Sequence, residues 1–154
     1  MYVDDLLMIE NNESYISSIT KELRKGFEIT YLGYVHFYLG IEVTQHMKSI
    51  FLSQKKYIGY LLNRFGMIEC NPLTTPMEQN LNLTFIEGKK FEDATKYRQR
   101  VGSLNYLTTT RPDISFAIGI LSSFMQKPCE GHWSAAKRVL KYLNGTQDFR
   151  IKYT

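Results

Sequence analysis

The segment Tyr2-Val3-Asp4-Asp5-Leu6-Leu7-Met8-Ile9 decides how the fold of this chain is interpreted. It places two adjacent carboxylates, Asp4 and Asp5, among apolar residues, where the loss of their hydration must be offset. A tight β-hairpin with both acids at its tip would provide this, because carboxylate oxygens bind a hard divalent cation such as Mg²⁺. The alternative is an ordinary polar turn, in which Asp is common. The dipeptide alone leaves both interpretations open.

The residues that follow predict a helix and then a second hairpin. Asn12 can cap a helix that stops near Gly26, because apolar residues recur between them at helical spacing. Over residues 35–44 apolar and polar residues alternate, which predicts one half-buried strand. Residues 45–49 are expected to form a turn, and residues 50–52 the returning strand.

The remainder of the chain is predicted to be mostly helical. Ser53 can cap a helix that ends at Gly66, and residues 67–92 form a long connection without sustained periodicity. Three further helices are expected, the first capped by Asp93 and the second with Pro112 in its first turn. Alternation resumes over residues 149–154, which begins another strand.

Composition limits where such a protein can act. The 154 residues contain no long apolar run and no secretory signal, and the two cysteines lack metal-like spacing. We therefore expect an intracellular, cytoplasmic protein with no membrane partner. Residues 1–53 hold four Lys and Arg against seven Asp and Glu, whereas residues 54–154 hold fifteen against eight. The basic part could bind a phosphate backbone, or it could carry ordinary solvated charge.

A series of short motifs, which occur in a fixed order along nearly the whole chain, resembles the motifs of a known family. They are Tyr2-Val3-Asp4-Asp5, Leu39-Gly40-Ile41-Glu42-Val43, Leu52-Ser53-Gln54, Arg64-Phe65-Gly66-Met67, Thr75-Pro76-Met77, Val101-Gly102-Ser103-Leu104, Thr110-Arg111-Pro112-Asp113-Ile114, His132-Trp133 and Ala135-Ala136-Lys137-Arg138-Val139-Leu140. The chain resembles the C-terminal half of the reverse transcriptase of Copia-type LTR retrotransposon Pol polyproteins. No single motif is decisive, but the ordered set is specific.

This resemblance implies an α+β fold, in which a partial polymerase palm of β-hairpins plus a helix precedes a helical thumb bundle. Residues 1–53 would be the C-terminal part of the palm with the catalytic hairpin, and residues 54–66 the first thumb helix. Residues 67–92 would be the long connection. Residues 93–154 would form the helical thumb and the start of the connection towards RNase H.

The resemblance also implies site residues and partners. Asp4 and Asp5 would be catalytic and would bind Mg²⁺, or Mn²⁺ in its place, while Tyr2 and Val3 would lie beside the primer end. Primer or nucleic-acid contacts are further implied for the turn Ser53-Gln54 and for three basic residues of the last helix: Lys137, Arg138 and Lys141. Partners in the parent enzyme would be an RNA or DNA template-primer, a dNTP, the upstream fingers and palm, and the downstream RNase H portion. Strand packing, a helix cap and a solvated helix face are the simpler explanations of the same residues.

The chain also departs from the family pattern. A further catalytic aspartate is expected on an earlier palm strand. No other aspartate here lies on an apolar strand that could pair with the first hairpin: Asp93 and Asp113 look like helix-start residues, and Asp148 lies past the glycine stop at Gly145. Tyr34 stands where the family pattern leads us to expect an acid. We therefore expect a fragment of an RNA-directed DNA polymerase that is inactive in isolation. The alternatives are a non-catalytic nucleic-acid-binding remnant and an unselected relic, and the parent element would place the protein in a retrotransposon particle.

Overall fold

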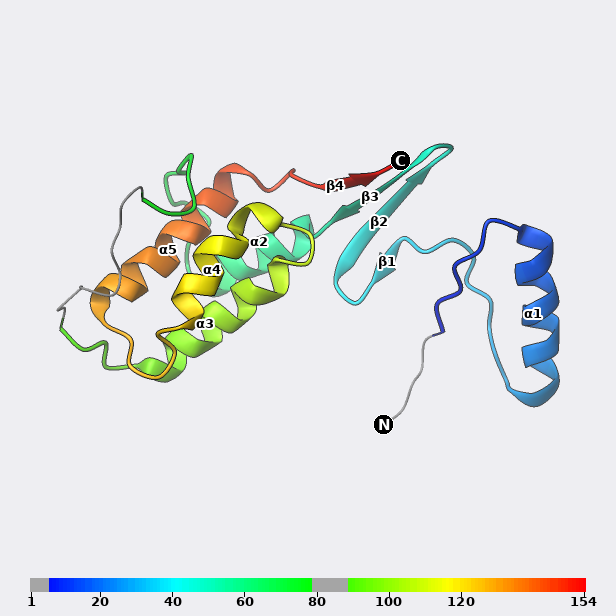
Figure 1. Cartoon of the computed structure of the whole chain (residues 1–154), viewed down its shortest axis with the longest axis horizontal. Coiled ribbons are helices and arrows are strands. Elements are labelled where there is room, and N and C mark those ends of the chain that lie inside the picture. Colours follow the sequence, from blue (N-terminus) through cyan, green and yellow to red (C-terminus); the bar gives the residue numbers. More distant parts are fainter. Residues whose placement is uncertain (1–5, 79–88) are drawn as a thin grey trace. The chain divides into compact units, whose positions relative to one another are not determined.

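The computed structural model describes residues 6–78 and 89–154 (Figure 1). Contacts group the chain into two compact units, Met1–Val35 and His36–Thr154. Their described parts contain five α-helices and one four-stranded antiparallel sheet, which confirms the expected α+β class. Within these residues, no helix combines the length and the apolar character needed to cross a membrane.

The first unit contains helix α1 (Glu13–Gly26), at the predicted place. The Asn12 side chain caps it by accepting a hydrogen bond of 3.0 Å from the backbone N–H of Ser14. The Tyr34 hydroxyl donates to a carboxylate oxygen of Glu13, which ties the segment after the helix to its first turn and raises the pKa of Tyr34. The position where an acid was expected is therefore used as a contact to α1.

The second unit begins with a sheet in the order β1-β2-β3-β4, and here the predicted single strand is wrong. Residues 35–44 instead contribute to two strands, β1 (Phe37–Tyr38) and β2 (Ile41–His46), joined by a tight turn at Leu39-Gly40. Both turn residues have positive φ, 46° for Leu39 and 78° for Gly40, as a two-residue hairpin turn requires. The alternation of apolar residues continues through the turn and therefore hides it.

The other strands follow the predicted order. Strand β3 (Ser49–Ser53) pairs with β2, and β4 (Ile151–Tyr153) pairs with β3 from the far end of the chain. Because paired residues share a face, Val43, Leu52 and Ile151 lie on one face of the sheet, next to Ile50 and Tyr153. No residue of the four strands is buried, so this apolar face is open within the described part of the unit.

Helix α2 (Lys55–Arg64) follows β3 directly and buries Ile58, Leu61 and Leu62. Gly66 ends it with φ 65°, and the N–H of Met67 donates to the carbonyl of Leu62 at 2.7 Å. A left-handed residue just after a helix favours glycine, so the predicted stop at Gly66 is confirmed.

Three further helices pack with α2 in a bundle (Figure 1): α3 (Ala94–Leu107), α4 (Ser115–Ser122) and α5 (Glu130–Gly145). The Asp93 carboxylate caps α3 by accepting from the N–H of Lys96 at 2.8 Å, and the short 3₁₀-helix η2 (Pro112–Ile114) leads into α4. The bundle core is fully buried, with 0% or 1% exposure at Val101, Leu104, Leu107, Ile114, Ala117, Ile118, Leu121, Val139, Leu140 and Leu143.

The described part of the long connection runs along α5. The side-chain amide of Asn144 donates to the carbonyl of Cys70 at 2.9 Å, and the N–H of Leu73 donates to the carbonyl of Lys141 at 3.3 Å. A Cβ on Gly145 would lie 2.9 Å from the Cβ of Pro72, so this close approach requires glycine. The segment 67–78 is therefore packed against the bundle.

Candidate nucleic-acid interface

The four residues expected at the catalytic hairpin, Tyr2, Val3, Asp4 and Asp5, lie outside the described residues. Their roles stay predictions. Residues 6–78 and 89–154 contain no group of three or more His, Cys, Asp or Glu that could hold a metal ion. The other acids considered from sequence have structural contacts instead: Asp93 caps α3, Asp148 pairs with Lys55 and Asp113 pairs with Arg111.

Ser53 and Gln54 lie where β3 passes into α2, at the junction between sheet and bundle. The predicted cap at Ser53 is wrong by one residue, because Ser53 ends β3 and Gln54 is the N-cap of α2; the Ser53 hydroxyl accepts from the N–H of Lys55 at 3.2 Å. The Gln54 side chain is 1% exposed, and its carbonyl oxygen accepts from the Thr110 hydroxyl at 2.7 Å. Its amide nitrogen is buried and has no hydrogen-bond partner in the described part of the chain. Gln54 therefore faces the interior and connects the strand end to the loop before η2.

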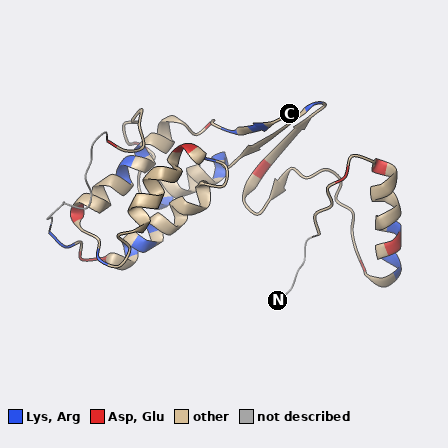
Figure 2. Cartoon of the chain, viewed as in Figure 1, with Lys and Arg blue, Asp and Glu red and all other residues tan. Residues whose placement is uncertain are grey.

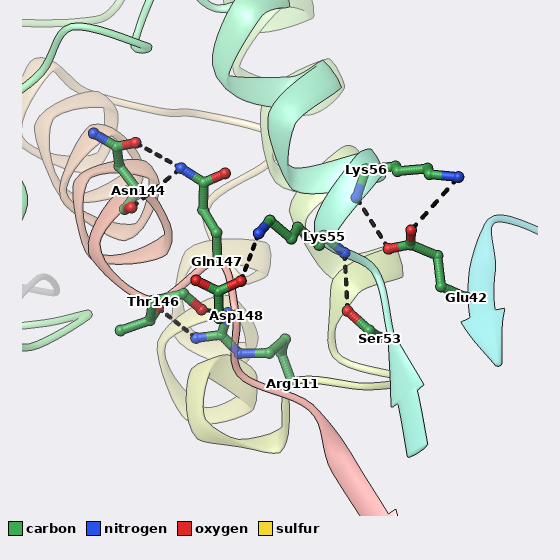
Figure 3. Close-up of polar contacts among 9 residues, drawn as sticks. All are labelled: Glu42, Ser53, Lys55, Lys56, Arg111, Asn144, Thr146, Gln147 and Asp148. Atoms are coloured by element: carbon green, nitrogen blue, oxygen red, sulfur yellow. Dashed lines mark hydrogen bonds and ion pairs between the residues drawn. The ribbon is translucent and has the colours of Figure 1, made fainter. Parts of the chain in front are cut away.

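Ion pairs surround the same junction (Figure 3). Glu42 on β2 accepts from the N–H of Lys56 at 3.2 Å and lies 3.7 Å from its ammonium group. The Lys55 ammonium donates to Asp148 at 2.6 Å, and this hydrogen bond raises the pKa of Lys55. The Lys55–Asp148 pair is solvent-exposed and adds little stability, whereas the partly buried Glu42 links β2 to the start of α2.

Beneath the junction, Arg111 forms a buried network that residue patterns did not predict. Its guanidinium group is 1% exposed and donates to both carboxylate oxygens of Asp113, at 2.9 and 2.8 Å. It also donates to the carbonyl and hydroxyl of Thr146 at 2.9 and 2.7 Å, and the Tyr142 hydroxyl donates to Asp113 at 2.8 Å. The network joins η2 to the end of α5. The sequence feature that could have indicated this network is the opposite charge of Arg111 and Asp113, which lie on either side of Pro112.

Lys137, Arg138 and Lys141 do come together on one side of α5. They line a surface hollow of about 410 Å³ between the helix and the connection, with Leu73, Glu78, Gly131, Ser134 and Ala135. Arg138 is already engaged there, because it donates to Glu78 at 2.8 Å and to the hydroxyl of Thr75 at 3.1 Å. No described acid pairs with the ammonium group of Lys137 or Lys141. The hollow can therefore attract an anion through these two lysines.

The described residues form an α+β fold with a hollow beside α5 that three basic residues line, and comparison with known proteins identifies the family. A model of the reverse transcriptase (RNA-dependent DNA polymerase) family matches residues 1–79. The chain belongs to this family, and its relatives include Copia-type retrotransposon Pol polyproteins, which confirms the resemblance seen in the sequence. No solved structure matches the chain.

Three relatives show how much of a longer protein the chain represents. It is 42% identical to the retrovirus-related Pol polyprotein from transposon RE1 of Arabidopsis thaliana, over 98% of this chain and 10% of that polyprotein. It is 37% identical to the one from transposon TNT 1-94 of Nicotiana tabacum, over 95% of this chain and 12% of that polyprotein. It is 39% identical to the uncharacterized mitochondrial protein AtMg00810 of Arabidopsis thaliana, over 95% of this chain and 60% of that protein. The chain thus corresponds to a reverse-transcriptase segment of a retrotransposon Pol polyprotein.

Proposed function

We propose that residues 1–154 form the C-terminal palm and the thumb of an RNA-directed DNA polymerase. The observation that carries this proposal is the family match over residues 1–79, which includes the Asp4-Asp5 pair, strands β1 to β3 and α2. In this arrangement residues 1–53 belong to the palm and residues 54–66 are the first thumb helix. After the connection 67–92, residues 93–154 form the helical thumb and the start of the connection towards RNase H.

Asp4 and Asp5 would bind divalent metal ions, Mg²⁺ or Mn²⁺, in the parent enzyme. Two such ions, when bound, stabilise both the attacking primer oxygen and the leaving pyrophosphate. A two-metal site needs carboxylates from more than one strand. In the sequence, no other aspartate lies on an apolar strand that could pair with the first hairpin. We therefore expect these 154 residues alone to hold nucleic acid without extending a primer.

The basic part of the chain would hold the template-primer. The turn at Ser53 starts α2, and the ordered contacts around it would keep the β2–β3 hairpin in a fixed place on the bundle. Lys137 and Lys141 would contact phosphates from the hollow beside α5, with Arg138 held at its edge by Glu78. Such contacts make affinity strongly dependent on salt.

Primer extension tests the catalytic part of the proposal. The 154-residue chain is incubated with a poly(A)/oligo(dT) template-primer, dTTP and Mg²⁺ or Mn²⁺, and we expect no extension. Extension that disappears in Asp4→Asn but not in Asp148→Asn would overturn the expected inactivity.

Metal titration tests the carboxylate pair independently of catalysis. Asp4→Asn removes one anionic ligand, so Mn²⁺ binding measured by calorimetry should weaken at least tenfold relative to the unchanged chain. Asp148→Asn is the matched control, because this acid is exposed and pairs with Lys55. Equal Mn²⁺ binding by the unchanged chain and Asp4→Asn would mean that the acids form only a turn, and would favour a non-catalytic nucleic-acid-binding remnant.

A further inference from the structure

Trp133 on α5 is surrounded by cations from two helices. The guanidinium carbon of Arg100 lies 3.5 Å from the centre of its ring, and the ammonium groups of Lys96 and Lys137 lie 5.9 and 5.6 Å from it. Phe91 stacks on the same indole with ring centres 4.6 Å apart. A cation near an aromatic face is favourable. Three cations at one ring nevertheless repel one another. We call the group the Trp133 cluster; it consists of Trp133 with Lys96, Arg100 and Lys137.

Arg100 is the buried cation of this cluster, and it has no carboxylate partner among the described residues. Its side chain is 3% exposed and lies between Trp133 and Phe65, with its guanidinium carbon 4.7 Å from the Phe65 ring. Its Nε and Nη1 atoms are buried without a hydrogen-bond partner in the described part of the chain. Burial lowers the pKa of Arg100 to about 10, so the group is still charged at neutral pH. A buried charge without a counter-ion is unfavourable, and an anion nearby would relieve it.

The exposed lysines of the cluster carry its charge to the surface. Lys96 and Lys137 are both solvent-exposed, and none of the ion pairs within residues 6–78 and 89–154 involves either of them or Arg100. Because a buried cation acts through a medium of low dielectric constant, it adds to the potential at both ammonium groups. Asp93 accepts from the backbone N–H of Lys96 at 2.8 Å but pairs with none of the three side-chain cations, so their charge is not neutralised by an ion pair within the described residues.

The spacing of these cations follows two helix stripes. Lys96 and Arg100 are four residues apart on α3, and Trp133, Lys137 and Lys141 are successively four apart on α5, so each set lies on one helix face. The stripe on α5 runs about 12 Å. Figure 2 shows Lys and Arg on both α3 and α5. Lys137 belongs to the Trp133 cluster and also lines the hollow, so the two adjoin at this lysine.

We propose that Lys96 and Lys137, above the buried charge of Arg100, bind the phosphodiester backbone of a nucleic acid. The inference rests on the proposed function and extends its contact surface from α5 to α3. A repeating anion suits cations that are spaced along two stripes. An acidic protein segment is less favoured, because its carboxylates pair best with an accessible guanidinium and that of Arg100 is buried, whereas the accessible lysine ammonium groups bind phosphate as point charges.

Fluorescence anisotropy of a labelled RNA–DNA hybrid with the full 154-residue chain tests the two lysines. Affinity is measured between 50 and 200 mM salt for Lys96→Gln, Lys137→Gln and the control Lys21→Gln, an exposed lysine on α1. Each loss of a phosphate contact should reduce the slope of log K against log salt by about 1. We expect this reduction for Lys96→Gln and Lys137→Gln, and the slope of the unchanged chain for Lys21→Gln.

Arg100→Met tests the buried charge separately from packing. Methionine keeps much of the apolar contact with Trp133 and removes the unpartnered N–H groups. We expect affinity for the hybrid to fall several-fold while the melting temperature is unchanged or higher. A structural role alone would give the reverse result, with a lower melting temperature and unchanged affinity, and would overturn the role of Arg100.

The possible failures are distinguishable. If the unchanged chain does not bind the hybrid, the proposed function itself fails. If it binds, but Lys96→Gln and Lys137→Gln behave like Lys21→Gln, only the Trp133 cluster is excluded. Competition by a poly-glutamate peptide as strong as that by unlabelled hybrid would also overturn the inference, in favour of an acidic protein partner.

Discussion

The helical bundle and the four-stranded sheet of the second unit are built in opposite ways. The bundle has a closed core in which residues such as Leu104 and Leu140 have no exposed surface, whereas no residue of β1–β4 is buried. Burial of apolar surface is the main stabilising term in folding. The bundle can therefore hold itself together, while the sheet depends on strand pairing and on its junction with α2.

This contrast predicts unequal effects of the same kind of truncation. Leu104→Ala removes a side chain with 0% exposure and should lower the free energy of unfolding by roughly 2–5 kcal/mol, because it also leaves a cavity. Ile50→Ala in the sheet, where the residue is 42% exposed, should lower it by less than about 1 kcal/mol. Urea denaturation followed by circular dichroism measures both. A loss of more than 2 kcal/mol for Ile50→Ala would show that the open sheet face is covered in solution.

The two ion-paired aspartates near the junction sharpen the comparison. Asp113→Ala leaves the buried guanidinium of Arg111 without its carboxylate partner, so unfolding should become easier by about 3 kcal/mol. Asp148→Ala breaks the exposed pair with Lys55, and we expect no measurable change. Thermal denaturation of both variants against the unchanged chain checks this. Equal effects would mean that Arg111 does not carry the link between η2 and α5.

Acid titration gives an independent test of Asp113. Burial raises the pKa of this carboxyl, but hydrogen bonds from Arg111 and Tyr142 outweigh burial and hold the pKa below its ordinary value. Since the folded value is the lower one, the stabilisation is complete above the ordinary carboxyl pKa of about 4 and is lost as the pH falls through the folded value. Asp113→Asn should show a weaker loss of stability in that acid range than the unchanged chain.

Local signals explain what the sequence could predict. Asn12, Asp93 and Gly66 act within a few residues of themselves, so the ends that they define on α1, α3 and α2 are confirmed. The ordered motifs also predicted the family, because they record a shared ancestry that does not depend on contacts. The charge of residues 54–154 pointed to the basic surface but not to its location.

Contacts between distant segments explain what the sequence could not predict. Arg111 looks like the residue before a helix start, yet its role depends on Thr146 and Tyr142, which approach it only in the folded bundle. The pairing of β4 with β3 joins residues about a hundred positions apart, and nothing in either strand specifies the partner. The buried position of Arg100 could not be predicted either, because the rings that it contacts, Trp133 and Phe65, come from two other parts of the chain.

In the turn between β1 and β2, two adjacent residues should respond to substitution in opposite directions. Gly40 has φ 78°, and a Cβ there would lie 3.0 Å from the Tyr106 hydroxyl, so Gly40→Ala should destabilise the hairpin by about 1–2 kcal/mol. Leu39 has φ 46° and is 70% exposed, so Leu39→Gly removes strain without removing a core contact and should stabilise the turn by up to about 1 kcal/mol.

Amide hydrogen exchange in β1 and β2 measures these two changes where they act. Protection of the N–H of Val43, which donates to the carbonyl of His36 across the hairpin, should fall in Gly40→Ala and rise in Leu39→Gly. Amides of the bundle core should exchange as in the unchanged chain, because the sheet and the bundle meet through few contacts. If Gly40→Ala also loosened the core, the sheet would be part of the same cooperative unit, and the contrast between the two regions would be wrong.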